Sequence, residues 1–184
     1  MNNNLQKPSN EPVWETWESI LLKTLTLGAV LQDAVRGRKI PPITKIVCIP
    51  RGGLHVVNVL SRQLAMGGED VLLLGMTRFN REHNQESGDF KIGQLPRRED
   101  VEGHVVLLAE EVFDTCETAV RAIKELEALG AKRVITAAIH YKPLRNKTNF
   151  VPDFYIDETN GWIHYPWEVI DPIGTLYERT LASK

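Results

Sequence analysis

Residues 104–118 read HVVLLAEEVFDTCET, and this stretch decides the fold. Residues 105–109 form an unbroken apolar run, which is typical of a parallel strand that is buried on both faces. Three carboxylates follow, on Glu110, Glu111 and Asp114, and after them the apolar residues recur at helical spacing. A strand, an acidic turn and a helix N-terminus in this order predict one end of an open α/β sheet, where such folds bind ligands.

The acidic turn combines groups that suit different parts of one ligand. Like charges this close repel each other, so the cluster needs a cation, ligand hydroxyls or a proton. Glu110 and Glu111 can accept hydrogen bonds from a vicinal diol or hold Mg²⁺ through water. Thr115 and Thr118, together with the amides that open the helix, form a cradle for an anion. Asp114 lies between these two sites and is placed to handle a proton. Helix capping with solvated glutamates is the alternative, and it explains only one or two of the five residues.

The composition indicates a single globular domain. The chain has 184 residues, 42% of them hydrophobic and 25% charged, and a net charge of −2 gives no electrostatic reason to bind nucleic acid or membranes. Two cysteines, Cys48 and Cys116, make no disulfide framework and favour a reducing compartment. Neither a secretory signal nor a membrane-length apolar stretch is present in the sequence. We therefore expect a cytoplasmic protein with a disordered tail at 1–12 and one domain at 13–184.

The rest of the chain alternates between helical and strand patterns, which favours an α/β fold with a parallel sheet. The polar residues 77–102 are either a lid or a solvated hairpin or insertion. Trp14 and Trp17 are expected in the core. Helices are predicted at about 14–35, 54–65 and 118–129, and strands at 45–49, 71–76, 105–109, 133–140 and 154–156.

Four segments, in order, resemble one protein family. LLAEEVFDTCET (107–118) resembles the phosphoribosyl-diphosphate motif of type I phosphoribosyltransferases, in which two acids, two spacers and Asp-Thr-Gly-x-Thr follow a strand. IVCIPRGG (46–53) resembles the pyrophosphate loop, and residues 77–102 lie where the family has its mobile lid. IHYKP (139–143) and PDFYIDETNGWIHYPWE (152–168) resemble the purine-binding half of the branch that uses hypoxanthine, guanine or xanthine. Four motifs in order are more specific than any one of them.

The resemblance, which covers about residues 40–170, implies both a fold and an activity. The fold is that of type I phosphoribosyltransferases, an α/β fold with a mostly parallel central sheet, flanking helices and a small hood drawn largely from residues 143–184. The activity is that of a Mg²⁺-dependent glycosyltransferase (a pentosyltransferase) of purine salvage. It transfers ribose 5-phosphate from phosphoribosyl diphosphate to N9 of a 6-oxopurine, releasing pyrophosphate and a nucleoside monophosphate. A homodimer without nucleic-acid or membrane partners is implied as well.

The resemblance also assigns roles in the sugar-phosphate half of the site. Glu110 and Glu111 match the acids that hold the ribose hydroxyls and, through water, a metal. Asp114 matches the aspartate that acts as a general base near the purine N7. The pyrophosphate loop comprises Arg51 and Gly52, and in the family the peptide before the arginine, here Pro50–Arg51, is often cis. The 5′-phosphate loop comprises Thr115, Cys116, Glu117 and Thr118.

The purine half of the site follows from the later motifs. Lys142 matches the lysine that donates to the exocyclic purine oxygen. Trp162 and Ile163 match residues that flank the base and read it through main-chain carbonyls. Glu168 falls where relatives have an acid near the base and the metal. Without the family, Lys142 would be a solvated lysine at a strand end, and the tryptophan would be a packing residue.

Cys116 departs from the family pattern, which has glycine at this position. If the backbone φ is positive there, cysteine costs about 1–2 kcal/mol and crowds the phosphate site, whereas a negative φ makes it harmless. Cys116 could also be a redox-sensitive thiol at a helix N-terminus, although the neighbouring carboxylates oppose thiolate formation.

Two other functions remain open. The first is a non-catalytic nucleotide-binding homologue that acts as a sensor or regulatory protein, which Cys116 favours. The second is a phosphoacceptor receiver domain. That class has an acidic pair after its first strand and an acceptor aspartate after a later one, whereas all the acids here follow a single strand.

Overall fold

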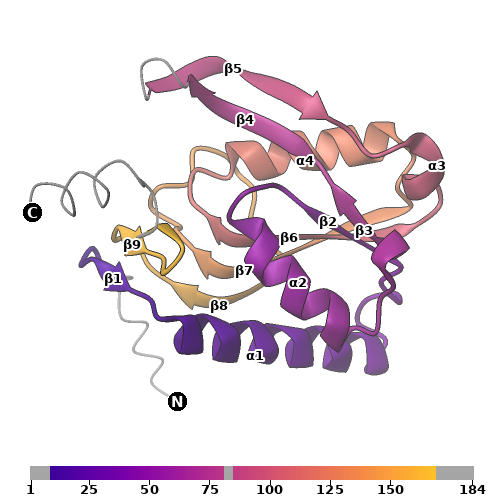
Figure 1. The fold of residues 1–184 in the computed structure, drawn as a ribbon, viewed down its shortest axis with the longest axis horizontal. Coiled ribbons are helices and arrows are strands. Elements are labelled where there is room, and N and C mark those ends of the chain that lie inside the picture. Colours follow the sequence, from indigo (N-terminus) through magenta and orange to yellow (C-terminus); the bar gives the residue numbers. More distant parts are fainter. Residues whose placement is uncertain (1–8, 81–84, 169–184) are drawn as a thin grey trace, which may run out of the picture.

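The computed structural model describes residues 9–80 and 85–168 and has one central sheet with helices on both faces (Figure 1). The sheet has five parallel strands in the order β3-β2-β6-β7-β8. The strand order reverses between β2 and β6, so the loops that follow these two strands meet at the switch point where open α/β sheets bind ligands. The strands are β2 (Lys45–Cys48), β3 (Val71–Leu73), β6 (Val105–Phe113), β7 (Arg133–Tyr141) and β8 (Phe154–Glu158).

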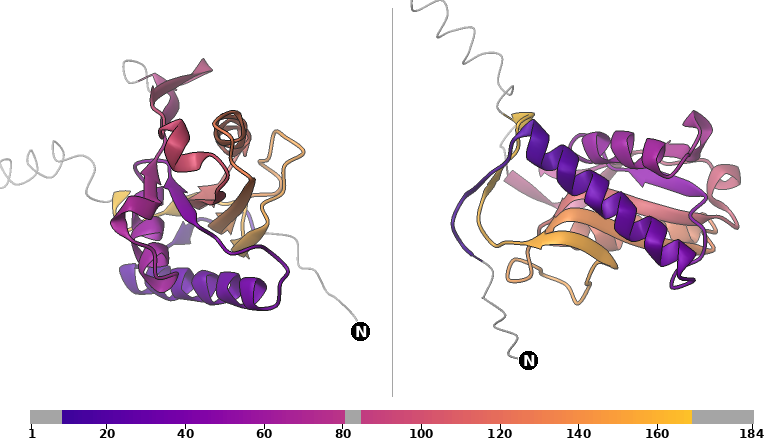
Figure 2. Two further views of the ribbon diagram at one scale, coloured as in Figure 1. Left: turned by 90° about the vertical axis from the view of Figure 1, so that its right-hand side faces the viewer. Right: turned by 90° about the horizontal axis from the view of Figure 1, so that it is seen from below.

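Two helical layers cover the sheet, which confirms that its strands are buried on both faces. α1 (Trp17–Arg36) and α2 (Gly53–Gln63) cover one face, and α4 (Glu117–Ala128) lies over the other (Figure 2). Alternate residues of β6 pack into the two layers: Leu107 lies in the cluster with α1 and α2, and Leu108 lies in the cluster with α4. Among the described residues, no helix has both the length and the apolar character needed to cross a membrane.

The strand β6 is longer than its apolar run predicts. It continues through Phe113 because Glu110, Val112 and Phe113 pair in register with residues of β7. Glu110 and Glu111 therefore belong to the strand itself, and the turn begins only at Asp114. The sequence misplaces this boundary because two adjacent glutamates end the hydrophobic pattern but do not end the hydrogen-bonded ladder.

The described part of residues 77–102 contains two paired strands rather than a structureless loop. β4 (Gly75–Asn80) and β5 (Gln85–Gln94) pair antiparallel, and the short helix α3 (Arg98–Val101) follows. The predicted strand at 71–76 is therefore divided between β3 and β4. Phe90 and Ile92 of β5 pack against the core cluster of α4, so the hairpin rests on that helix. The hairpin interpretation is confirmed for the described residues, and a lid movement stays a prediction.

The small hood contains a strand that the sequence did not reveal. β1 (Val13–Trp14) pairs parallel with β9 (Ile163–His164). The helix α1 begins only at Trp17, because Thr16 and Ser19 form a capping box in front of it. The prediction that Trp14 and Trp17 are core residues is wrong, since their exposed fractions are 71% and 52%.

The N-terminal segment is ordered closer to its start than predicted. Residues 1–8 lie outside the described residues, but residues 9–12 do not form a free tail. The carbonyl of Ser9 accepts hydrogen bonds from the amides of Asn160 and Gly161 at 2.9 and 3.2 Å. The hood is therefore assembled from both ends of the described chain.

Candidate functional site

The loop after β2 packs directly against the two glutamates of β6. Oε1 of Glu110 accepts a hydrogen bond from the amide of Ile49 at 3.0 Å. The Pro50–Arg51 peptide is cis, as the resemblance implied. A Cβ atom on Gly52 would lie 1.8 Å from Oε1 of Glu111, so the glycine leaves the space that this carboxylate fills. The predicted pyrophosphate loop and acidic pair thus form one unit.

Burial makes the acidic pair a poor place for two negative charges. Burial raises the pKa of Glu110 well above its ordinary value, and the neighbouring Glu111 charge raises it further. Burial also raises the pKa of Glu111 to about 7, with a further contribution from the charge of Glu168. Oε2 of Glu111 is buried without a hydrogen-bond partner within the described chain. The pair is therefore prepared to accept hydrogen bonds from hydroxyls or to bind a cation.

The predicted phosphate loop opens the helix α4. Cys116 is its N-cap residue, with φ at 61° and ψ at −2°, so a non-glycine residue occupies the left-handed region here. Thr115 accepts a hydrogen bond at its carbonyl from the amide of Lys147 at 3.0 Å. Glu117 and Thr118 are the first two helical residues and are half-buried. The amides of the first turn of α4 therefore lie at this loop, as an anion cradle requires.

The thiol of Cys116 is buried, and its surroundings disfavour the thiolate. Burial, together with the charge of Asp114, raises the pKa of this thiol to about 11. Its sulfur packs among apolar side chains that include Phe113 and Ala119. Because the thiolate is the reactive form, this environment argues against the redox-sensitive alternative.

Asp114 is held between two cations at the end of β6. Its Oδ2 accepts from Nζ of Lys142 at 3.0 Å, and its Oδ1 accepts from Nε of Arg145 at 2.6 Å. Lys142 is almost fully buried, and its amide donates to the carbonyl of Phe113 at 3.0 Å. The ammonium of Lys142 also lies 5.8 Å from the ring centroid of Trp162, which is within the range of a cation–π contact. Lys142 therefore connects the acidic turn to the hood.

In the hood, alternate main-chain carbonyls along β9 point toward β1 and away from it. The carbonyl of Trp162 accepts a hydrogen bond from the amide of Val13 at 2.8 Å, so β1 already uses this carbonyl. Successive carbonyls of a strand point to opposite sides, which directs the carbonyl of Ile163 away from β1. The side chain of Ile163 is buried, whereas that of Trp162 is exposed. The expectation that both main-chain carbonyls read a base stays a prediction, because a carbonyl oxygen has two lone pairs and that of Trp162 uses one of them on β1.

Glu168 and Arg51 lie at the rim of the site and are both exposed. The amide of Glu168 donates to the carbonyl of Tyr165 at 3.0 Å, and its charge acts on Glu111. Arg51 follows the cis peptide and precedes α2. The structure therefore brings Glu168 within electrostatic reach of the acidic pair.

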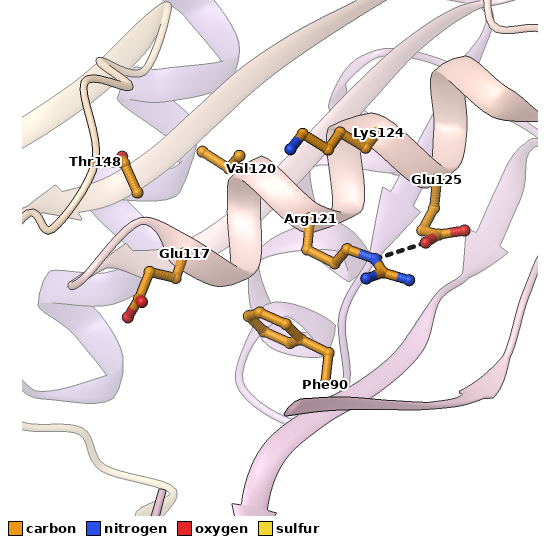
Figure 3. Close-up of a pocket in the computed structure, with 7 residues that line it drawn as sticks. All are labelled: Phe90, Glu117, Val120, Arg121, Lys124, Glu125 and Thr148. Carbon is orange, nitrogen blue, oxygen red and sulfur yellow. Dashed lines mark hydrogen bonds and ion pairs between the residues drawn. The ribbon is translucent and has the colours of Figure 1, made fainter. Parts of the chain in front are cut away.

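A pocket of about 400 Å³ lies beside the phosphate loop, between α4 and β5 (Figure 3). Phe90 faces the first turns of the helix across this pocket, and Glu117 lies at its edge. Arg121 donates to Glu125 at 2.6 Å within it. The hairpin thus stands over the helix whose N-terminus forms the predicted phosphate cradle.

Sequence reasoning missed four residues that surround the predicted set. Arg145 pairs with Asp114, and the amide of Val13 donates to the carbonyl of Trp162 in the hood. Tyr165 and His140 lie behind Glu111. Arg145 comes three positions after Lys142 and could have been suspected from its charge, whereas the other three make contacts that no local pattern reveals.

Comparisons with known proteins agree with this geometry. The model of the phosphoribosyl transferase domain family matches residues 31–171. A solved purine phosphoribosyltransferase from Pyrococcus horikoshii Ot3 is 29% identical, with a TM-score of 0.67, covering 85% of this chain and 94% of that one.

Two more distant structures share the fold. A xanthine-guanine-hypoxanthine phosphoribosyltransferase from Helicobacter pylori is 19% identical, with a TM-score of 0.69 and coverage of 95% of this chain and 100% of that one. A hypothetical protein from Neisseria gonorrhoeae with bound ppGpp is 21% identical, with a TM-score of 0.71 and coverage of 95% and 98%.

Proposed function

The chain belongs to the phosphoribosyl transferase domain family, and we propose that it is a 6-oxopurine phosphoribosyltransferase of purine salvage. The proposed reaction transfers ribose 5-phosphate from phosphoribosyl diphosphate to N9 of hypoxanthine, guanine or xanthine. Pyrophosphate and a nucleoside monophosphate are the products. The 29% identity to a purine phosphoribosyltransferase supports the purine class.

One observation carries the proposal for a purine: the position of Lys142. Its ammonium contacts the carboxylate of Asp114 at 3.0 Å and lies 5.8 Å from the ring centroid of Trp162. A base stacked beside the tryptophan would therefore find a donor for its exocyclic oxygen and a carboxylate for a ring N–H in the same place. This pair of partners fits an oxopurine, which presents an acceptor oxygen and a ring nitrogen on one edge.

The acidic pair fits a divalent cation. Oε2 of Glu111 is a buried oxygen without a partner in the described chain, and carboxylate oxygens are the ligands that Mg²⁺ prefers. Glu111 and Glu168 would hold Mg²⁺, directly or through water. When bound, Mg²⁺ would neutralise charge on the pyrophosphate leaving group.

The chain's own residues supply the remaining chemistry. Glu110 and Glu111 would accept hydrogen bonds from the two ribose hydroxyls and orient C1′ toward the base. Arg51 and the amides around Gly52 would stabilise the negative charge that builds on the departing pyrophosphate. The amides that open α4 would bind the 5′-phosphate. Asp114 would accept or share the N7 proton as N9 attacks C1′.

The test is a panel of purines with labelled phosphoribosyl diphosphate and Mg²⁺. We expect a monophosphate from at least one of hypoxanthine, guanine and xanthine, and its loss in Asp114→Asn. Asp33→Asn is a matched control, because Asp33 pairs with Arg36 on the exposed surface of α1. Wild-type protein that forms no monophosphate with any of the three purines would contradict the assignment.

A second candidate function is a homologue that binds nucleotides without turnover. The left-handed conformation of Cys116 favours it, because a cysteine side chain stands at a position built for glycine. In that case the wild-type protein would bind phosphoribosyl diphosphate in a calorimeter without catalysis, and Cys116→Gly would restore turnover. Turnover by the wild-type protein would eliminate this candidate.

A further inference from the structure

Two buried polar side chains, Tyr165 and His140, lie directly behind Glu111 without belonging to the proposed substrate contacts. The hydroxyl of Tyr165 donates to the main-chain carbonyl of Glu111 at 3.1 Å. The same hydroxyl lies 3.0 Å from Nδ1 of His140. Their exposed fractions are 3% and 1%, so both depend on protein partners for their hydrogen bonds.

The other side of His140 is anchored on the N-terminal part of the fold. Its Nε2 lies 3.0 Å from Oε1 of Glu15. The ammonium of Lys23 pairs with the Glu15 carboxylate at 2.5 Å and with the carboxylate of Asp157, in β8, at 2.7 Å. The same ammonium lies 3.4 Å from Nε2 of His140. Burial alone would raise the pKa of Glu15, but the hydrogen bonds from Lys23 and Ser19 lower it, so Glu15 is a carboxylate.

The number of hydrogens on these groups limits the directions that the contacts can take together. The carboxylate of Glu15 accepts, so Nε2 of His140 carries a hydrogen. The hydroxyl of Tyr165 has a single hydrogen, and its bond to Glu111 leaves its oxygen free to accept from Nδ1. Only a doubly protonated His140 supplies a hydrogen to every link from Glu15 to Glu111. Burial, together with Lys23, lowers the pKa of His140, so this state is favoured at acidic pH.

We propose that Tyr165 and His140 are positioning residues that hold the main chain of Glu111, and that they anchor it on Glu15 in front of α1. The proposal rests on the proposed function, in which the Glu111 carboxylate receives ribose hydroxyls and Mg²⁺. A main chain that is held from behind orients the carboxylate in front, just as the hydrogen-bond partners of metal ligands orient those ligands in other proteins. The N-terminal segment, which lies outside the proposed substrate contacts, thereby supports the ribose site.

The first experiment is independent of catalysis. The imidazole of His140 is titrated by NMR in the wild-type protein and in Tyr165→Phe, and its resonance is identified by its absence in His140→Gln. The phenyl ring keeps the stacking on Trp167, whose ring centroid is 4.7 Å away. We expect the pKa of His140 to fall in Tyr165→Phe, because the hydroxyl oxygen accepts from the imidazolium. An unchanged or raised pKa would overturn the proposal, because the hydroxyl would then be idle or would donate to His140 instead of Glu111.

The second experiment measures how the contact between Tyr165 and Glu111 affects substrate affinity. In Tyr165→Phe we expect the affinity for phosphoribosyl diphosphate with Mg²⁺ to fall by about tenfold, and the affinity for the purine to stay unchanged. Tyr155→Phe is the matched control, because that hydroxyl bonds Glu158 on the exposed surface, and it should behave as wild type. Equal losses for both substrates, or none, would refute positioning. Affinity is measured by calorimetry and does not require turnover. A wild-type protein without turnover would therefore refute the proposed function, whereas the affinities would still test the positioning role of Tyr165 and His140.

Discussion

The carboxylate of Glu111 fills the space that a side chain on Gly52 would occupy: a Cβ atom on residue 52 would lie 1.8 Å from Oε1 of Glu111. Gly52 has φ at −60° and ψ at −45°, values that any residue adopts, so its missing side chain is needed for space and not for backbone freedom. The glycine of the predicted pyrophosphate loop therefore also makes room for the predicted diol site.

Gly52→Ala should lower activity without lowering stability. The clash falls on the end of a flexible side chain, so Glu111 can swing aside at little cost to folding, but its carboxylate then leaves the ribose site. We expect the KM for phosphoribosyl diphosphate to rise by about 10–100-fold, with the midpoint of urea unfolding unchanged. Gly68→Ala is the matched control, because no atom lies within 4 Å of its added Cβ. A comparable KM in the two variants would contradict the packing argument.

Cys116→Gly should be more stable than Cys116→Ala. The left-handed φ of 61° costs a non-glycine residue about 1–2 kcal/mol, and the greater unfolded-state entropy of glycine removes part of that gain. We expect the free energy of unfolding of Cys116→Gly, measured by urea denaturation, to exceed that of Cys116→Ala by about 1 kcal/mol, because both variants lack the buried sulfur. Cys116→Ala keeps the strain and should show no gain. Ala65→Gly, at another left-handed residue with φ at 56°, should gain a similar amount away from the site.

Much of the fold was predictable because local patterns record it. The apolar run 105–109 indicated a strand buried on both faces, and both helical layers confirm it. The order of the motifs placed Arg51 and Asp114 at the same edge of the sheet, which the strand order confirms. The end of β6 was wrong, because register with β7 keeps Glu110 in the ladder although it breaks the hydrophobic pattern.

The contacts that complete the site were not predictable, because they join residues far apart in the sequence. β1 forms only by pairing with β9, and the apolar spacing around Trp14 indicated a helix instead. His140 of β7 and Tyr165 of the hood meet behind Glu111 of β6. No sequence motif near either residue indicates this contact.

The unliganded protein should become less stable as pH rises through the titration of Glu111. Its pKa is about 7 in the folded state and close to 4.5 when unfolded, so the folded state binds more protons between these values. Stability from this group is present below pH 4.5 and lost as pH rises to about 7. We expect Glu111→Gln to be more stable than wild type at pH 8 by an amount on the order of 3 kcal/mol, and to lose that advantage at pH 4.5.

The measurement is urea unfolding of both proteins at the two pH values without metal. Comparing the variant with the wild type removes the contribution of the histidines, and because the Glu111 charge also raises the pKa of Glu110, the difference reports the titration of Glu111 together with its effect on Glu110. Glu99→Gln is the control, because Glu99 is exposed and pairs only with Arg97 among the contacts of the described chain. An equal stability difference at both pH values would show that Glu111 is not the titrating group.

Lys142 and Arg145 share Asp114 as a partner, yet they should affect different substrates. Lys142 also lies against Trp162 and is buried, whereas Arg145 is half exposed. Lys142→Met removes a charged donor to the purine oxygen, a loss of about 1.5–3 kcal/mol, and should raise the KM for the purine by about 10–150-fold. The KM for phosphoribosyl diphosphate should stay near its wild-type value. Lys142→Arg should not restore purine binding, because a planar guanidinium does not fit the space of a buried ammonium.

Arg145→Met is the matched variant: it removes the other cation on Asp114 and should lower kcat while leaving the purine KM unchanged. If both methionine variants raised the purine KM equally, Lys142 would act through Asp114 and not as the donor to the base.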